Sequence, residues 1–183
     1  MARRPTRRVS TLLATCASVL AACGGGGPGE REVRVDVRHV IRDAAGNPVI
    51  LLHERDGDRS LPIWIGLPEA RSIAARLERI EPARPNTHDL AKSLLEGLGA
   101  RLERVIVTEL RERTYYGLIV IRGPDGSVEI DSRPSDAIAL ALRLDAPIFV
   151  RETLFEEAGQ EDEPAAPAGR RVRFRGDDEA RAG

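Results

Sequence analysis

The stretch VEIDSRPSDAIALAL, residues 128–142, contains the transition that decides the fold. Apolar and polar residues alternate up to Asp131, which is the pattern of a strand with one buried face. Pro134 then fits the first turn of a helix, where a backbone N–H has no partner inside the helix. The helix that follows carries an apolar face formed by Ala137, Ile138, Ala141 and Leu142. The stretch therefore predicts a strand that leads directly into a helix.

A similar transition lies upstream in LPIWIGLPEA, residues 61–70, which predicts a strand ending near Ile65 and a helix from about Pro68. Two more strands precede each transition; they are expected at 33–41 and 49–52, and at 102–110 and 115–121. The order strand-strand-strand-helix thus occurs twice, which indicates an internal duplication. We expect a compact α+β domain, with a mixed β-sheet and helices packed on it.

A middle helix is expected between the halves, beginning after Asn86 or Thr87; its apolar stripe is Leu90, Ala91, Leu94, Leu95 and Leu98. A short strand at 147–150 and a helical turn at 152–158 complete a domain that spans residues 32–158. Residues 159–183 are mostly Gly, Pro, Ala and charged residues, so we expect a disordered tail.

Three stretches of this domain resemble one known family: LPIWIG followed by Glu69-Ala70, RPNTHDL at 84–90, and IDSRPSDAIALA at 130–141. Their order and spacing are similar to those of the bifunctional nuclease domain, once a domain of unknown function, over about residues 32–158. The resemblance implies a compact fold with a mixed sheet, a homo-oligomer, and the cleavage of DNA and RNA to which plant members are linked. Two departures are Ser132, where alanine is usual, and Asn86 inside the Pro-Thr-His motif.

The first 22 residues are expected to be a lipoprotein signal peptide. A basic start is followed by the apolar run TLLATCASVLAA at 11–22, which is too short to span a bilayer. Leu20-Ala21-Ala22-Cys23 resembles a bacterial lipobox, so Cys23 is the predicted lipid anchor, and residues 23–31 form a glycine-rich tether. These features predict a protein of the cell envelope, held by lipid at the periplasmic face of the outer membrane.

Charge and cysteine content exclude several kinds of chemistry. The chain has a net charge of −1, and removing residues 1–22, with four arginines and no acid, leaves −5. A nucleic-acid partner would therefore need a local basic patch. The two cysteines lie at Cys16, in the predicted leader, and Cys23, so disulfides and thiolate sites are excluded from the mature domain. The tyrosines and the single tryptophan are too scattered in the sequence to predict a base-stacking platform.

Metal-dependent phosphodiester cleavage needs two or three converging carboxylates on Mg²⁺ or Mn²⁺. Asp131 ends a strand and Asp136 lies in the first turn of the next helix, so these two are the predicted metal ligands. Glu69 occupies the equivalent place in the first half. The full set of catalytic candidates is Asp131, Asp136, His88, Asp89 and Glu69, and the candidates for phosphate binding are Arg84 and Arg133.

Helix capping explains the same acids more economically, because Asp136, Glu69 and Asp89 all stand where first-turn acids are favoured by the helix dipole. Two functions thus stay open. One is an envelope-anchored nuclease that acts on DNA or RNA. The other is a noncatalytic envelope lipoprotein that binds a partner or assembles with itself. Convergence of Asp131, Asp136 and His88 would favour the first, and an exposed apolar patch would favour the second.

Overall fold

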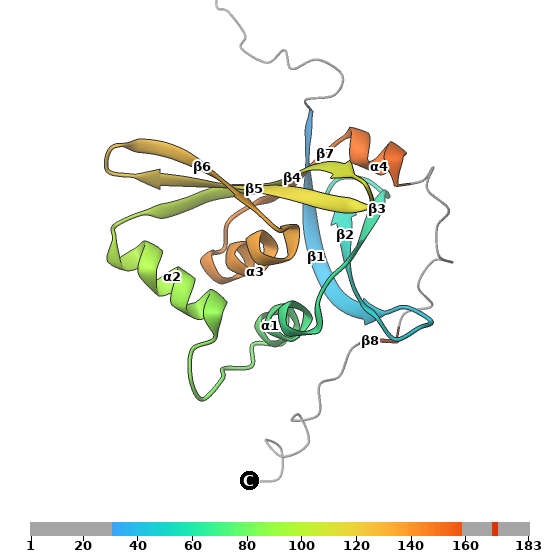
Figure 1. Ribbon diagram of the computed structural model, residues 1–183, viewed down its shortest axis with the longest axis horizontal. Coiled ribbons are helices and arrows are strands. Elements are labelled where there is room, and N and C mark those ends of the chain that lie inside the picture. Colours follow the sequence, from blue (N-terminus) through green and yellow to red (C-terminus); the bar gives the residue numbers. More distant parts are fainter. Residues whose placement is uncertain (1–30, 159–169, 172–183) are drawn as a thin grey trace, which may run out of the picture.

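The computed structural model describes residues 31–158 and 170–171 (Figure 1). The predicted signal peptide, Cys23 and all of the predicted tether except Arg31 lie outside these residues. In chain order, the elements are β1 (Glu32–Arg42), β2 (Pro48–Glu54), β3 (Ser60–Trp64), α1 (Leu67–Leu77), α2 (Thr87–Gly97), β4 (Arg101–Arg111), β5 (Thr114–Gly123), β6 (Gly126–Ser132), α3 (Pro134–Leu144), β7 (Ile148–Arg151), α4 (Thr153–Glu157) and β8 (Arg170–Arg171).

In the described part of the chain, the strands form one mixed sheet in the order β3-β2-β1-β7-β4-β5-β6. Strands β1 to β3 form one antiparallel meander and β4 to β6 form another. Strand β7 joins them, because it pairs antiparallel with β1 and parallel with β4. The α+β fold is confirmed, and the two predicted strand-strand-strand-helix units correspond to the two meanders with α1 and α3.

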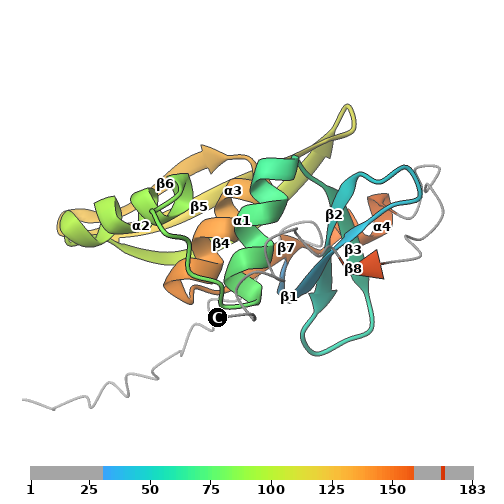
Figure 2. The ribbon, with the colours of Figure 1, turned by 90° about the horizontal axis from the view of Figure 1, so that it is seen from below.

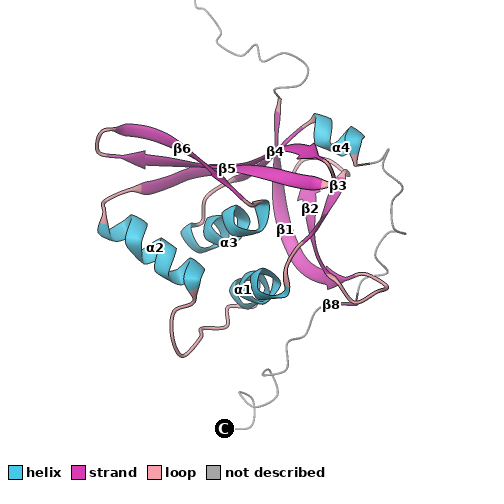
Figure 3. Cartoon of the chain, in the orientation of Figure 1, coloured by secondary structure: helices cyan, strands magenta, loops and turns pink. Residues whose placement is uncertain are grey.

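The helices α1 and α3 begin in the same way. Each follows an extended residue, Gly66 with φ −68° and ψ 154° or Arg133 with φ −68° and ψ 140°, and each has a proline at its first or second position. The two helices pack against each other, and α2 packs on α3. Figures 1 and 3 show α1, α2 and α3 gathered on one side of the sheet, while α4 lies against β3, β4 and β7.

The core is built almost entirely from aliphatic side chains. It is continuous from β2 and β3, through α1 and α3, to β4, β7 and α4; its largest fully buried members include Ile50, Leu52, Leu61, Ile73, Ile138 and Leu154. Helix α3 is buried along most of its length, whereas β6 is exposed along most of its length. The first turn of α3 is therefore set into the core, whereas α1 begins at the surface and becomes buried from Ala70.

Helix α1 ends at Leu77, because Arg79 adopts a left-handed φ of 58° and the Ile80 N–H bonds back to Ala75 O. One detail differs from the sequence prediction: only part of the apolar stripe of α2 packs on the core. Ala91 and Leu95 pack against the core, whereas the other three leucines of the stripe are more than half exposed: Leu90, Leu94 and Leu98.

Within the predicted tail, Arg170–Arg171 forms β8, which pairs with Ile41–Arg42 of β1. Over the ranges that the structure describes, none of the helices has the length and apolar character needed to cross a membrane.

Candidate functional site

The first turns of α1 and α3 meet at one arginine. Arg133, the residue just before α3, donates from Nη2 to Glu69 Oε1 over 2.7 Å and from Nε to Asp136 Oδ2 over 2.7 Å. Glu69 and Asp136 are each the third residue of their helix. The two halves of the domain therefore place equivalent acids on the same guanidinium.

A close approach of backbone segments holds this junction in place. A Cβ atom added at Gly117 of β5 would lie 3.3 Å from Ser132 O and 3.4 Å from Pro134 Cα. These are backbone atoms of the turn into α3, so they cannot move aside without displacing the helix. Glycine at position 117 thus lets β5 support the start of α3 directly.

His88, the second residue of α2, connects Asp136 to Ser72 of α1. Its Nε2 lies 3.1 Å from Asp136 Oδ1, and its Nδ1 lies 2.9 Å from Ser72 Oγ. Arg143 Nη2 donates to the same Ser72 oxygen over 2.9 Å. With a neutral imidazole, Ser72 then donates to Nδ1, and Nε2–H donates to Asp136. We call Ser72, His88 and Asp136 the relay.

Arg143 anchors the other end of the relay. Its side chain is only 5% exposed, and it donates to Asp89 Oδ1 over 2.6 Å, to Ala139 O over 3.0 Å and to the Ser72 hydroxyl. Asp89 also accepts from the Asn86 N–H, and Asn86 Oδ1 accepts from the N–H groups of His88 and Asp89, which forms a capping box. Helix capping thus explains the contacts of Asp89 with Asn86, and its ion pair with the buried Arg143 is an additional contact.

Hydrogen bonds favour the charged forms of Asp136 and Asp89. Burial raises the pKa of Asp136, but hydrogen bonds from Arg133 and His88 outweigh burial, and the net pKa is below the usual value. Burial likewise raises the pKa of Asp89, and the hydrogen bond from Arg143 reverses the direction. The hydrogen bond to Asp136 raises the pKa of Arg133. The arginines therefore neutralise these carboxylates directly.

Ser72 also lines a cleft of about 560 Å³ between α1, the connection after it and the start of α2. Asn86 and Asp89 lie on the same wall, and Glu81 is the other acid of the lining. Five basic side chains contribute to the cleft: Arg71, Arg76, Arg79, Lys92 and Arg143. We call it the cationic cleft. The lining holds more basic than acidic side chains, although three of the basic ones are paired with acids: Arg143 with Asp89, Arg76 with Asp145 and Lys92 with Glu96. An anionic ligand would compete with these pairs for the arginines and the lysine.

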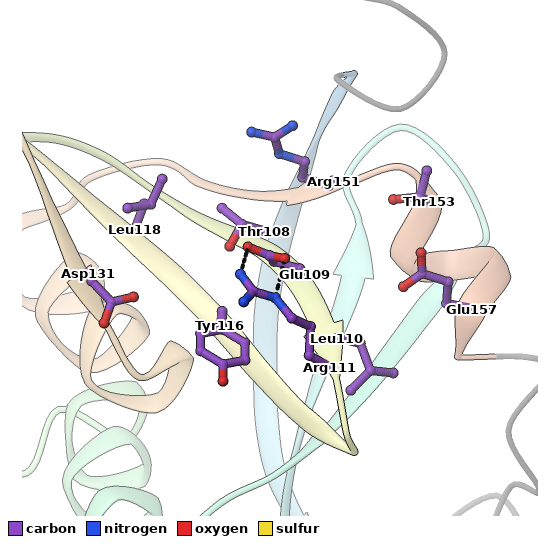
Figure 4. A pocket seen from close by; sticks show the side chains of 10 residues that line it. All are labelled: Thr108, Glu109, Leu110, Arg111, Tyr116, Leu118, Asp131, Arg151, Thr153 and Glu157. Atoms are coloured by element: carbon purple, nitrogen blue, oxygen red, sulfur yellow. Dashed lines mark hydrogen bonds and ion pairs between the residues drawn. The ribbon is translucent and has the colours of Figure 1, made fainter.

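The structure brings together His88, Asp89, Asp136, Glu69 and Arg133 of the predicted site residues, but it does not bring Asp131 to them. Ile130 of β6 pairs with Ile119 of β5, which belongs to the core. Because side chains alternate between the two faces of a sheet, Asp131 points to the opposite face from Ile130. There Asp131 lines a separate cleft with Arg111, Tyr116 and Glu109, which Figure 4 shows. Arg84 lies exposed in the connection between α1 and α2.

The fit of this site to Mg²⁺ or Mn²⁺ is poor. Asp136 and Glu69 already receive hydrogen bonds from Arg133, and Asp89 receives one from Arg143. Across residues 31–158 and 170–171, no group of three or more His, Cys, Asp or Glu side chains is arranged to hold a metal ion. We therefore derive no catalytic step through a metal.

Ser72 and Arg143 are the two members of the network that sequence reasoning missed. Ser72 is three residues after Glu69, on the same face of α1, and Arg143 is seven residues after Asp136, on the same face of α3. An arginine at that spacing on an otherwise apolar buried helix is the signal that could have found it. The buried serine carries no comparable signal.

Fold and site together define a class: a small α+β domain with two halves of the same strand-strand-strand-helix order, whose junction carries a hydrogen-bonded relay beside a cationic cleft. The family model of the bifunctional nuclease domain matches residues 50–163, which include the whole relay. The chain belongs to the bifunctional nuclease family.

Individual relatives agree with this assignment. An uncharacterized protein of Mycobacterium tuberculosis is 42% identical over 144 residues, which is 76% of this chain and 85% of the relative. Bifunctional nuclease 1 of Oryza sativa is 31% identical over 118 residues, and that of Arabidopsis thaliana is 30% identical over the same length. Each plant match covers 62% of this chain but only 36% of the plant protein, so the plant proteins contain much that this chain does not match.

Proposed function

We propose that the protein is a nuclease that hydrolyses phosphodiester bonds of DNA or RNA, with the strand's phosphates bound in the cationic cleft. The observation that carries the proposal is the position of Ser72. Ser72 lines the cationic cleft, and its hydroxyl is hydrogen-bonded to His88, which is in turn hydrogen-bonded to Asp136. A proton can therefore pass from the cleft to an imidazole whose other nitrogen is held by a carboxylate.

The burial of Ser72 decides its role in this proposal. The residue is only 8% exposed, so its oxygen is better placed to pass on a proton than to attack phosphorus itself. A water in the cleft attacks phosphorus and gives its proton to Ser72 Oγ, while the Ser72 proton moves to His88 Nδ1. The bond from phosphorus to the ester oxygen breaks, and the leaving oxygen takes a proton from solvent. Asp136 stabilises the imidazolium.

The test is cleavage of end-labelled single-stranded DNA and RNA by purified protein, with and without chelator. Ser72→Ala and His88→Ala should each lower the rate by about 100-fold or more, the usual contribution of general acid–base catalysis. Ser93→Ala is the matched control, because Ser93 bonds to a backbone carbonyl on the exposed side of α2. Undiminished cleavage by both relay variants would overturn the proposed role. Loss of cleavage with chelator would identify a metal requirement and thus a different active centre.

A second candidate function, self-assembly, is favoured by the apolar surface at the end of the molecule where α2 and β6 lie (Figures 1 and 2). Its members are Leu90, Leu94, Leu98, Val128 and Ile130, all at least 44% exposed. In the described ranges β6 pairs only with β5, so its other edge is open to a second copy. Leu94→Glu should then convert an oligomer into a monomer by light scattering, whereas a wild-type monomer would exclude assembly through this surface.

We propose that the protein is located in the cell envelope. Support comes from the lipobox resemblance at Leu20 to Cys23 and the glycine run after it. Membrane fractionation tests this directly: the full chain should sediment with membranes, and Cys23→Ala should be released or remain unprocessed. Identical fractionation of both proteins would exclude Cys23 as the anchor.

A further inference from the structure

A second cleft lies on the other side of the relay from the cationic cleft. It has a volume of about 470 Å³, within the range of about 300–1,000 Å³ that is usual for small-molecule sites. Its lining includes Trp64, Tyr115, Arg113, Arg133 and Asn47. We call it the Trp64 cleft. Trp64 is the last residue of β3 in the first meander, and Tyr115 is the second residue of β5 in the second meander. The fold therefore places two aromatic residues that are far apart in the sequence in one cleft.

Trp64 is fixed in orientation although it is exposed. Its Nε1–H donates to Asp43 Oδ2 over 3.0 Å, and Asp43 is itself held by the backbone N–H and the side-chain amide of Asn47. The residue is 37% exposed. An exposed indole whose polar atom is already bound presents its ring as the remaining binding surface.

Two arginines lie beside these rings, although Arg133 is also paired with Glu69 and Asp136, and Asp43 places an acid at Trp64. Arg133 lines the Trp64 cleft, and Arg113 lies exposed in the turn between β4 and β5, with a left-handed φ of 62°. An aromatic surface flanked by arginines is the combination by which proteins bind unpaired bases together with their phosphates. A duplex keeps the faces of its bases stacked and cannot offer them to Trp64.

The relay links the two clefts. Arg133 of the Trp64 cleft bonds to Asp136, Asp136 bonds to His88, and His88 bonds to Ser72 of the cationic cleft. A strand that occupied both clefts would contact both ends of this chain of hydrogen bonds, at Arg133 and at Ser72.

We propose that the Trp64 cleft binds a nucleobase of single-stranded DNA or RNA by stacking on Trp64, and that the protein therefore selects unpaired strands. This inference rests on the proposed function for the nature of its ligand. It adds the subsite and the residues that would choose single strands over duplexes.

Trp64 is the only tryptophan of the chain, so its fluorescence reports the proposed contact without labels. The probes are a 12-residue oligothymidylate, the same sugar–phosphate chain without bases, and a blunt-ended duplex without a loop. The oligothymidylate should quench Trp64 in a saturable way, and the abasic chain and the duplex should not. Equal quenching by the abasic chain would overturn the proposal, as would oligothymidylate binding without quenching or a failure to bind at millimolar concentration.

Variants separate stacking from other effects on binding, measured by fluorescence anisotropy of labelled oligothymidylate. Trp64→Ala should weaken binding by about 5- to 150-fold, and Trp64→Phe should restore most of it. Tyr116→Ala is the matched control. Tyr116 is adjacent to Tyr115 in the sequence, but it lines the separate cleft that contains Asp131 and Arg111 (Figure 4). Equal effects of Trp64→Ala and Tyr116→Ala would refute the subsite.

Failure of the nuclease proposal would look different. Quenching by oligothymidylate together with the absence of cleavage, or with cleavage that is unaffected by Ser72→Ala, would leave the base subsite standing and remove the relay's catalytic role.

Discussion

Removing the carboxylate of Asp89 should destabilise the fold strongly, because it leaves the guanidinium of Arg143 buried without its acceptor. Arg143 is 5% exposed and Asp89 is 28% exposed, and the Nε–Oδ1 distance is 2.6 Å. Breaking a buried pair by deleting one partner costs about 3–5 kcal/mol. The loss of the acceptor for the Asn86 N–H adds to this, whereas the partial exposure of Asp89 lets water replace some of the lost contact. We therefore expect Asp89→Ala to lower the free energy of unfolding by about 3 kcal/mol.

Two further variants test the cause of this loss. Asp89→Asn keeps one oxygen for Arg143, but it turns an amide NH2 toward the Asn86 N–H and removes the negative charge, so it should cost about 2 kcal/mol, less than Asp89→Ala. Combining Asp89→Ala with Arg143→Met removes both charges, so the double variant should be more stable than the sum of the single losses predicts, by about 2 kcal/mol.

The assay is equilibrium unfolding in urea at neutral pH. Glu96→Ala serves as the control, because Glu96 forms only an exposed pair with Lys92 on α2, at 3.7 Å, and should change stability by less than about 1 kcal/mol. If Asp89→Ala proves as mild as Glu96→Ala, or if the losses in Asp89→Ala and Arg143→Met simply add, then the buried pair does not stabilise the fold as argued.

Three other perturbations have defined outcomes. The pKa of Asp136 is lowered below 3.8, so its contribution to stability is complete above about pH 5 and is lost as pH falls through the folded-state pKa. Asp136→Asn should therefore weaken the fall in unfolding free energy at acid pH, measured by urea unfolding at several pH values. An unchanged fall would contradict the lowered pKa of Asp136. Gly117→Ala should cost about 1–3 kcal/mol, because its Cβ would press on the backbone before α3, whereas Gly123→Ala, with only an ordinary 3.8 Å neighbour, is the control whose equal loss would refute that reason. Arg79→Ala and Lys92→Ala should each reduce the slope of log affinity against log salt for a single strand by about 0.7, and unaltered slopes would exclude the cationic cleft as the phosphate site.

Local signals account for what the sequence could predict. The two strand-to-helix transitions are marked by proline in a first turn and by a change of apolar period, and both occur in the structure at Pro68 and Pro134. The position of β7 between the meanders depends on pairing with strands far away in the chain, for which no local pattern exists. The half-exposed stripe of α2 has a similar origin, because only the distance to α3 and β4 decides which leucines reach the core.

The residues of the site could likewise be predicted only where a local signal marks them. Glu69, Arg133 and Asp136 meet because the equivalent starts of α1 and α3 lie together, and the first turn of α2 adds His88. Asp89, from the same turn of α2, instead binds Arg143 near the end of α3. The grouping of Asp131 with them relied on nearness in sequence. Strand alternation overrides nearness, since neighbouring residues of β6 point to opposite faces of the sheet.

The central place of β7 also constrains how the chain can acquire its fold. Each meander is closed by hairpins and can form from neighbouring residues soon after they leave the ribosome. The strand that joins them, Ile148–Arg151, is synthesised after all six of their strands. Until then, the edges of β1 and β4 that β7 will occupy are open, and open edges invite pairing with other chains. Nascent chains stalled before Ile148 should therefore hold local hairpins while the central pairing of the sheet is still missing.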